Sequence, residues 1–485
     1  MMKRLDQKIV ASVVYVAAMF MAALDSTVVN VALRAIGSDL QVAPSAVGTV
    51  SVSYLVSLAV VLPVAGWLGD RWGTKRVLLL ALAIFTAASA LCGFADSLAF
   101  LNTARILQGA AGGLLTPVGM ALLFRTFPPQ ERAKLSRMLV LPIALAPALG
   151  PIIGGFIVDQ LSWRWVFYIN LPVGILVLLF GLLLLREHRE PAAGRLDWAG
   201  FLLSAPGLAM TVFALTQGAA RGWISPGIMV PGLCGLLLLT AFVFVELRNP
   251  EPMLDLRLLR DRLFRTMGLI SMFSAGGLLG MLYVFPLMYQ HVLDASALDT
   301  GLTTFPEALG LMVASQLMPF SYRRLGPKKL IALALVIASV LFVLLSLTGK
   351  GTDPWIPRIL LFLAGFSLGH AVGAVQITSF ANIAPPQMGR ASTLFTVQNR
   401  LGSALGMALL GTIMSAIGTS TVGASGIEQP NPEAYRIALL GAAAFLLLGL
   451  CAALSLRRGD TEAATLPKQA RGRNAEAAPA SAAGK

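Results

Sequence analysis

The segment Gly66-Trp-Leu-Gly-Asp70-Arg71-Trp-Gly73-Thr-Lys75-Arg76 joins two long apolar runs, over 46–69 and 76–95. A helix that crosses about 30 Å of hydrocarbon needs about 20 predominantly apolar residues. Both runs are therefore long enough to span a membrane. The charged residues between them belong in water, and Gly73 permits a sharp reversal of the backbone. The segment predicts two antiparallel membrane helices joined by a short charged turn.

Long apolar runs separated by short polar turns continue along the whole chain. Such runs predict an all-α membrane protein. Fourteen of them are long enough to span, and they lie over 9–33, 46–69, 76–95, 99–124, 135–158, 163–185, 198–217, 228–247, 263–290, 299–320, 328–347, 356–378, 394–417 and 435–456.

The composition of the 485 residues agrees with this class. The chain is 56% apolar and 12% charged, whereas an average soluble domain is about 45–50% apolar and about 25% charged. These values exclude a disordered chain, a coiled coil and most soluble enzymes. The net charge of +14 lies in short loops and forms no basic stripe with aromatic residues, so we expect no nucleic-acid partner. The cysteines fall in three different apolar runs, which favours buried apolar side chains over a metal site or a disulfide framework: Cys92, Cys234 and Cys451.

Lys and Arg are unevenly divided between the two sets of loops. With the N-terminus inside, the inner segments carry 29 of the 37 basic residues, the outer loops carry six, and two lie within spans. Positive charge concentrates in cytoplasmic loops. The sequence therefore predicts that both termini are cytoplasmic and that the polar tail, 459–485, is disordered there.

The turn after the second span contains the candidate gating residues. Asp70 stands at the end of a helix, where its carboxylate can pair with an Arg of a neighbouring helix and form a breakable latch. The alternative is a charged turn that only obeys the positive-inside rule. The expected gating set is Gly66, Asp70, Arg71, Gly73, Lys75 and Arg76.

Five blocks of sequence, in register along nearly the whole chain, resemble one family. The turn at 66–76 resembles the signature loop of the major facilitator superfamily. Arg105-Ile-Leu-Gln108-Gly109 is similar to the Arg-x-x-Gln-Gly motif of its proton-coupled branches. Gly150-Pro151-Ile-Ile-Gly154-Gly155 is similar to its antiporter motif. The blocks at 24–33 and 163–172, with fourteen spans, resemble its fourteen-helix drug:proton antiporter branch.

The resemblance has two departures. Arg34 stands where the motif of the first span usually continues into Pro, and this puts the shape of the outer mouth in doubt. Ala146 stands where the antiporter motif usually has Gly four residues before Gly150, but Ala still allows close helix packing.

The resemblance implies a major facilitator fold of fourteen transmembrane helices arranged as 6+2+6. We expect an N-terminal six-helix half over 1–190, two inserted peripheral helices within 191–250, and a C-terminal six-helix half over 251–458. The basic turn at 323–329 echoes the turn at 66–76, which supports an internal duplication.

Ionisable residues inside spans are costly and mark function by default. Asp25 in the first span and Arg105 in the fourth lie at similar depth by the helical rise of about 1.5 Å per residue. A carboxylate beside Arg stays ionised, so a change in their distance would bind or release a proton. We expect Asp25, Arg105 and Glu307 to couple protons. A static ion pair that fixes helix packing is the alternative for Asp25 and Arg105.

Other intramembrane residues are candidates for contact with a transported compound. Glu307 follows Pro306 and could serve as a counter-charge for cationic substrates or be hydrogen-bonded to a neighbouring helix. His370 is a weaker candidate, because a lone intramembrane His is more often a packed residue. The expected substrate-binding set is Asp25, Gln108, Glu307 and His370.

Small residues and a proline in the fifth span indicate a bend. Pro151 removes one backbone hydrogen bond, and glycines let helices approach closely. We expect Gly150, Pro151, Gly154 and Gly155 to form a hinge between the halves, with a static kink as the alternative.

Together these features predict a proton-driven antiporter of the bacterial cytoplasmic (inner) membrane. It would export lipophilic, often cationic, compounds by alternating access. We expect no catalytic residues, metal or cofactor, and no Gly-x-x-x-x-Gly-Lys-Ser/Thr nucleotide motif occurs. Expected partners are protons, lipophilic small molecules and membrane lipids, with a periplasmic adaptor protein as a further candidate. The alternatives are an exporter of a lysophospholipid, siderophore, antibiotic or metabolite, then a symporter, and last a membrane enzyme.

Overall fold

The computed structural model describes residues 6–42, 44–128, 131, 135, 145–146, 149–150, 152–158, 160–189, 196–422 and 428–457. Half of the expected fifth span, 135–158, including Pro151, falls outside the described residues, and the tail 459–485 falls wholly outside them. The first half of the described chain forms α1 (Gln7–Asp39), α2 (Pro44–Val47), α3 (Thr49–Val61), η1 (Leu62–Val64), α4 (Ala65–Trp72), α5 (Thr74–Gly93), α6 (Leu98–Thr126), α8 (Trp165–Tyr168) and α9 (Asn170–Leu184).

The remaining elements are also almost all helical. They are α10 (Trp198–Arg221), α11 (Pro226–Arg248), η3 (Leu256–Arg260), α12 (Arg262–His291), α13 (Ala297–Ser346), α14 (Trp355–Ser379), η4 (Pro385–Gln387), α15 (Met388–Ile417), β1 (Ser420–Val422), β2 (Glu428–Pro430) and α16 (Pro432–Leu454). The strands β1 and β2 form an antiparallel hairpin in which Thr421 pairs with Gln429.

Twelve helical segments of the described chain are long and apolar enough to cross a membrane. One of them, in α13, runs over 48 residues, which at about 1.5 Å per residue is more than twice the thickness of the hydrocarbon. Gly326 interrupts α13 with φ of +71° and ψ of 162°, a backbone conformation that favours glycine. The helix therefore reverses at Gly326, and its two parts coincide with the expected spans 299–320 and 328–347.

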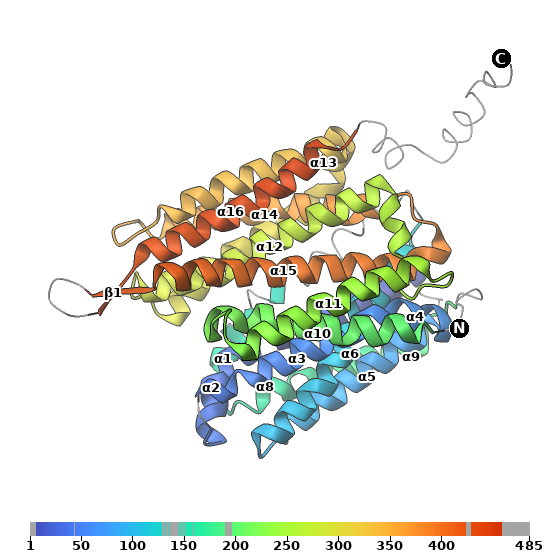
Figure 1. Ribbon diagram of the computed structural model, residues 1–485, viewed down its shortest axis with the longest axis horizontal. Coiled ribbons are helices and arrows are strands. Elements are labelled where there is room, and N and C mark those ends of the chain that lie inside the picture. Colours follow the sequence, from blue (N-terminus) through green and yellow to red (C-terminus); the bar gives the residue numbers. More distant parts are fainter. Residues whose placement is uncertain are drawn as a thin grey trace.

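The spans form two bundles that lie side by side (Figure 1). We call α1–α9 the N-terminal bundle and α12–α16 the C-terminal bundle. Each has an apolar interior in which large side chains are fully buried, such as Phe85 in the first bundle and Phe342 in the second. This burial holds the helices of each bundle together and fixes the directions in which their few polar side chains point.

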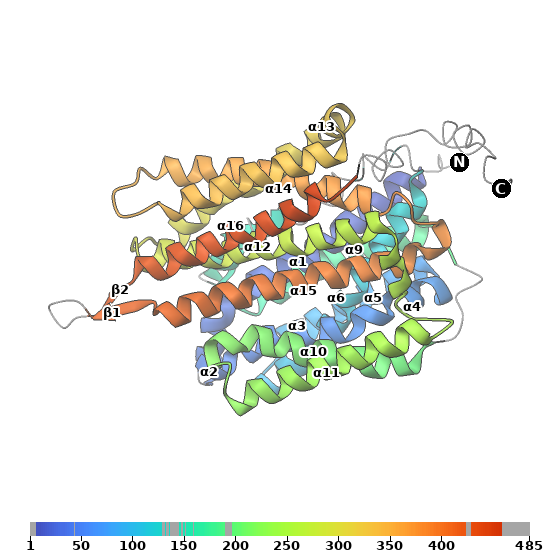
Figure 2. The same cartoon turned by 45° about the horizontal axis from the view of Figure 1, so that its top comes forward.

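The inserted helices α10 and α11 occupy different environments, although the sequence led us to expect both at the periphery. Helix α11 packs mainly on α10 and is largely exposed. Helix α10 packs on both α3 and α15 and so touches both bundles (Figure 2). Trp223, just after α10, donates a hydrogen bond from Nε1 to Thr412 Oγ1 of α15 at 2.7 Å. Helix α10 therefore lies against the joint between the bundles, and the more exposed α11 packs on it.

The two bundles also touch directly at the end of the molecule that carries the turn 66–76. Helices α4 and α6 pack there on α15. The rings of Phe124, from α6, and Phe380, after α14, have centroids 4.4 Å apart. We call this region the 66–76 end, and the end with the hairpin β1–β2 the hairpin end.

Candidate functional site

The N-terminal bundle contains a buried carboxylate, that of Asp25 on α1, which is 1% exposed. Its Oδ2 accepts a hydrogen bond from Arg105 Nη1 of α6 at 2.6 Å and forms an ion pair there. Its Oδ1 accepts hydrogen bonds from Gln108 Nε2 of α6 at 2.8 Å and from Asn170 Nδ2 of α9 at 3.0 Å. Three donors from two helices thus meet one carboxylate. We call Asp25, Arg105, Gln108 and Asn170 the Asp25 cluster.

The guanidinium of Arg105 is held on several sides. Its Nη1 also donates to Gln108 Oε1 at 2.8 Å, and its Nε donates to the carbonyl of Val50 at 3.4 Å. Its Cζ lies 4.2 Å from the centre of the Tyr54 ring, a cation–π distance. Close packing of α6 on α3 makes this arrangement possible, because a side chain at Gly109 would collide with Tyr54.

Asn170 reaches Asp25 from the start of α9. Helix α8 ends at Tyr168, and Asn170 is the first residue of α9. Ser89 of α5 accepts a hydrogen bond from Asn170 Nδ2 at 3.0 Å and donates one to the carbonyl of Phe167 at 2.9 Å. The block 163–172 contains Asn170, but nothing in the sequence places Asn170 beside Asp25, since the two lie 145 positions apart.

The hydrogen bonds of the Asp25 cluster suit an ionised carboxylate. An ionised carboxylate only accepts hydrogen bonds, whereas a protonated one must also donate. A proton on Asp25 would meet a donor at either oxygen and displace it. Binding of a proton would therefore loosen α1 from α6 or from α9. Because all four residues belong to the N-terminal bundle, such loosening is a change within that bundle.

The turn at 66–76 holds a second buried ion pair. Asp70 Oδ1 of α4 accepts a hydrogen bond from Arg125 Nη2 of α6 at 2.6 Å. Arg125 Nη1 also donates to Thr74 Oγ1 at 3.0 Å. The sequence predicts an Arg partner for Asp70 but does not identify Arg125, whose only signal is its place just after an apolar run.

Asp70 also lies against the C-terminal bundle. A side chain at Gly389, the second residue of α15, would collide with the Asp70 carboxylate. A carboxylate at the start of a helix interacts favourably with the partial positive charge there. One turn earlier in α4, a Cβ at Gly66 would lie 2.6 Å from both the Gly389 carbonyl and Thr393 Oγ1. Small residues thus bring α4 and α15 into backbone contact at the 66–76 end.

The other residues of the turn have different surroundings from Gly66 and Asp70. Gly73 has φ of +102° and reverses the chain between α4 and α5. Glu187 Oε1 accepts a hydrogen bond from Lys75 N at 2.9 Å, and its Oε2 accepts one from Arg76 N at 3.2 Å. Arg71 is exposed. Of the six expected gating residues, the structure therefore brings Gly66 and Asp70 to the contact between the bundles.

Glu307 lies in the C-terminal bundle on α13 and is 2% exposed. Neither of its carboxylate oxygens has a hydrogen-bond partner among the described residues. The expected alternative, a hydrogen bond to a neighbouring helix, is not found in that part of the chain. A buried carboxyl group without a partner is costly, which distinguishes Glu307 from the fully bonded Asp25.

His370 of α14 has partners at both ring nitrogens. Its Nδ1 donates to the carbonyl of Phe366 at 2.9 Å, and its Nε2 lies 3.2 Å from Ser321 Oγ of α13. Arg400 lies midway along α15, is exposed and forms no ion pair within the described ranges. The structure therefore does not bring His370 or Glu307 into the Asp25 cluster.

The described part of the hinge motif packs on α1. A side chain at Gly150 would collide with Thr27, and a Cβ at Gly154 would lie 3.1 Å from Val28 Cγ1. Gly155 has open space around it. The motif therefore lies against the same helix that carries Asp25.

The family model of the Major Facilitator Superfamily matches residues 15–407. The chain belongs to the Major Facilitator Superfamily. This facilitator contains both buried ion pairs and the contact between α4 and α15 within the matched residues.

Curated relatives of this facilitator align over most of its length. It is 32% identical over 407 residues to the multidrug resistance protein B homolog of Mycobacterium tuberculosis, covering 83% of this chain and 75% of that protein. It is 31% identical over 407 residues to the putative multidrug resistance protein MdtD of Klebsiella pneumoniae, covering 82% and 84%. It is 34% identical over 433 residues to the probable actinorhodin transporter of Streptomyces coelicolor, covering 86% and 74%.

A solved structure shows the same fold. The crystal structure of the human organic anion transporter MFSD10 (TETRAN) superposes with a TM-score of 0.66 at 15% identity, covering 92% of this chain and 99% of that one. At this identity the likeness concerns the fold alone.

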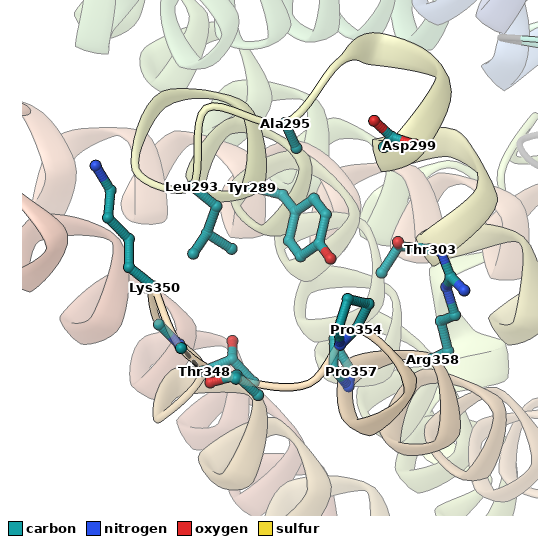
Figure 3. A pocket seen from close by; sticks show the side chains of 13 residues that line it. Tyr289, Leu293, Ala295, Asp299, Thr303, Thr348, Lys350, Pro354, Pro357 and Arg358 are labelled. Carbon is teal, nitrogen blue, oxygen red and sulfur yellow. Dashed lines mark hydrogen bonds between the residues drawn. The ribbon is translucent and has the colours of Figure 1, made fainter.

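A cavity of about 430 Å³ in this facilitator lies away from the Asp25 cluster. It opens at the hairpin end of the C-terminal bundle, between the segment after α12 and the loop between α13 and α14 (Figure 3). None of the expected site residues lines it.

Proposed function

We propose that this protein is a proton-driven antiporter that exports lipophilic, often cationic, compounds across the bacterial cytoplasmic membrane. The observation that carries the proposal is the Asp25 cluster, a buried carboxylate with three donors, one of them Arg105. Buried ionisable groups in membrane spans are characteristic of proton relays. The names of two relatives, each called a multidrug resistance protein, support the class of cargo.

The proposed cycle uses Asp25 as the proton carrier. A proton from the outside binds Asp25, displaces one donor of the cluster and changes the packing of α1. The protein reorients, releases the proton inside and carries a compound outward. Export of one positive charge against about 100 mV costs about 2.3 kcal/mol, so a proton gradient of ordinary size can drive it. In this proposal Gln108 contacts the compound, and Glu307 and His370 contribute from the C-terminal bundle.

Alternating access needs a contact that opens and closes. The packing of Gly66 and Asp70 on α15 supports a gate at the 66–76 end, with Arg71, Gly73, Lys75 and Arg76 shaping the turn. The packing of Gly150 and Gly154 on α1 supports a hinge that includes Pro151 and Gly155. Closure of that gate while the hairpin end opens would release cargo to the outside.

The proposed topology has fourteen transmembrane helices as 6+2+6 with cytoplasmic termini. The reversal of α13 at Gly326 and the basic residues of the inner loops support it. The proposed units are 1–190, 191–250, 251–458 and a cytoplasmic tail over 459–485. Proposed partners are protons, lipophilic compounds, membrane lipids and a periplasmic adaptor protein.

A second candidate function is export of another cargo by the same mechanism. A relative named as a probable actinorhodin transporter, 34% identical to this chain, favours a self-made antibiotic within that group. A lysophospholipid, siderophore or metabolite remains in the same class, and a symporter ranks below it.

Proton movement in vesicles tests the proposal. The purified chain is reconstituted with a pH-sensitive dye inside, and a panel of cationic and neutral lipophilic compounds is added to the native chain and to Asp25→Asn. We expect proton movement that depends on a compound in the native chain and is lost in the variant. Glu307→Gln, which neutralises the buried carboxyl group of the C-terminal bundle, is measured in parallel with Asp25→Asn. Full proton movement in Asp25→Asn would exclude Asp25 as the proton carrier. If no compound of the panel moves protons in the native chain, another cargo is favoured.

A further inference from the structure

The cavity at the hairpin end has a polar lining that the proposed cycle does not use. Its walls come from the end of α12, the start of α13, and the loop and first turns of α14. Its volume of about 430 Å³ lies in the range of small-molecule sites. Figure 3 shows Tyr289, Asp299, Thr303, Lys350 and Arg358 around one space, with the Tyr289 hydroxyl pointing into it.

Arg358 is the cation of this cavity that lacks an acidic partner among the described residues. Lys350 also lines the cavity, but its Nζ pairs with Asp294 Oδ2 at 3.1 Å. Arg358 packs its guanidinium 5.2 Å from the Trp355 ring, and its buried Nε has no hydrogen-bond partner in the described ranges. An unpaired guanidinium donor in a cavity suits a carboxylate or phosphate oxygen.

A second, independent observation comes from the wall opposite the loop. Thr303 is fully buried, and its Oγ1 lacks a hydrogen-bond partner within the described chain, although it lines the cavity. Figure 3 shows Thr303 on the same side of the cavity as Arg358. The long helices α13 and α14 both begin at this cavity, so the positive ends of two helix dipoles add to the charge of Arg358.

One acidic residue, Asp299, limits the negative charge that a ligand of the cavity can carry. Asp299 lines the rim and accepts a hydrogen bond from Ser296 Oγ at 2.7 Å. Its negative charge opposes a second negative charge on a ligand. A phosphodiester carries one negative charge, whereas a free phosphate carries about 1.5 to 2 at neutral pH. The cavity therefore favours the singly charged form.

The surface beside Arg358 is suited to lipid. Trp355, Ile356 and Ile359 point away from the bundle and are about half exposed or more. Trp is enriched where membrane helices meet the interface with water. A lipid whose acyl chains lie on this apolar surface would place its headgroup at the mouth of the cavity.

We propose that this cavity binds the phosphate of a singly charged lipid headgroup, with Arg358 and Thr303 as its ligands. The proposal is independent of the transported cargo and of Asp25. Binding would tie the starts of α13 and α14 together at the hairpin end.

Titration of the purified full-length chain tests this site. Lipid retained on the protein is measured by native mass spectrometry, and the unfolding midpoint Tm is measured in parallel. The probes are dioleoylphosphatidylglycerol, a dioleoylglycerol that lacks phosphate, and sodium phosphate. We expect phosphatidylglycerol to bind and raise Tm, and the glycerol lipid to do neither. Arg358→Gln should weaken phosphatidylglycerol binding about tenfold or more, since a hydrogen bond to a charged group is lost.

Matched variants distinguish a local effect from misfolding. Arg436→Gln removes an exposed Arg at the same end, 3.8 Å from Glu433, and should bind lipid as the native chain does. Thr303→Val keeps the shape of the side chain and should weaken binding by a smaller factor. If sodium phosphate raises Tm and phosphatidylglycerol does not, the cavity binds a free anion, and the proposal that it binds a lipid headgroup is overturned. Equal binding to the native chain and to both cavity variants would overturn the proposal altogether.

Discussion

At the scale of single residues, Asp25 and Glu307 illustrate two ways to bury a carboxyl group. Asp25 is surrounded by donors, and Glu307 has none within the described residues. Donors offset the cost of burying the Asp25 carboxylate, whereas no described residue offsets the cost of burying Glu307. The two carboxyl groups, one in each bundle, therefore lie in very different surroundings.

Asn170 should be as important to the Asp25 cluster as Gln108. Asn170→Ala removes one of the two donors to Asp25 Oδ1 and the donor to Ser89 Oγ, both of them buried hydrogen bonds. A loss of this kind costs about 1–3 kcal/mol. We expect a clear fall in Tm and loss of compound-driven proton movement. Asn382→Ala, which removes an exposed amide bonded to Asp261, is the control and should change neither. A native Tm in Asn170→Ala would show that the amide is dispensable.

Asp39, at the end of α1, should make stability depend on acid pH. Hydrogen bonds from Trp163 first, and then from Arg164, lower the pKa of Asp39. A carboxyl group with a lowered folded pKa stabilises the fold fully above its unfolded pKa of about 3.9, and this is lost as pH falls through the folded pKa.

The expected result is a Tm advantage of the native chain over Asp39→Asn at pH 5 and above that disappears as the pH falls below about 4. The effect is small, because the Asp39 side chain is 46% exposed. Trp163→Phe removes the hydrogen bond that lowers the pKa of Asp39 most. It should therefore reduce the Tm difference between chains that carry Asp39 and chains that carry Asp39→Asn. A constant difference between native chain and Asp39→Asn at all pH values would contradict the account.

The sequence drew attention to Asp25 and Arg105 because charge is rare within apolar runs, and to Asp70 because it stands in the charged turn 66–76. The structure places each of them in a buried ion pair, and their roles in transport stay predictions. The sequence did not identify Arg125 or the role of Asn170. Arg125 lies among several basic residues that share a loop, and only the packing of α6 on α4 selects it. Asn170 is neutral, so apolar patterning gives it no weight, and its contact with Asp25 depends on how α9 packs on α1.

At the scale of helices, the apolar runs predicted the position of nearly every described span. The ends were harder to predict, because apolar length does not mark where helices continue into water. Helix α15 begins at Met388 rather than at 394, and α1 continues to Asp39 rather than ending at 33. The hairpin β1–β2 was not predicted at all, since its strands are three residues each and depend on the two helices that hold their ends together.

The crossing of α4 and α15 should tolerate no side chain at Gly66. A Cβ there would lie 2.6 Å from the carbonyl of Gly389, and backbone cannot move aside as a side chain can. Overpacking of this kind typically costs about 1–3 kcal/mol. Gly66→Ala should therefore separate the bundles at the 66–76 end.

The separation is measured with Thr393→Cys, which replaces a fully buried residue of this contact. We expect a maleimide reagent to label it about tenfold faster or more in the Gly66→Ala background. Gly227→Ala on α11 is the control, because open space surrounds that position. Equal labelling in all three backgrounds would mean that the contact adapts to the extra methyl group.

At the scale of the whole molecule, α10 connects the two bundles beside their joint. Bundles that rock against each other must slide along α10 on at least one side. The sequence did not predict that α10 contacts both bundles, because apolar content shows that a helix is in the membrane and says little about which neighbour it meets.

A reversible cross-link tests whether α10 moves against α15. Ala219 Cβ lies 3.2 Å from the position of a Cβ at Gly411, close to the spacing of a disulfide. Ala219→Cys with Gly411→Cys, in a chain whose exposed Cys234 and Cys451 are replaced by Ser, should lose transport on oxidation. Reduction should restore it. Each single Cys variant is the control, and full transport by the oxidised pair would show that α10 and α15 move together.

All members of the Asp25 cluster come from the N-terminal bundle. Substitutions elsewhere in the chain can therefore leave the cluster unchanged. Mutations in the C-terminal bundle can reshape what is recognised without disturbing a single hydrogen bond to Asp25. If Asp25 carries the proton, as proposed above, a lineage can change the cargo contacts of its C-terminal bundle in small steps and keep its proton carrier at each step.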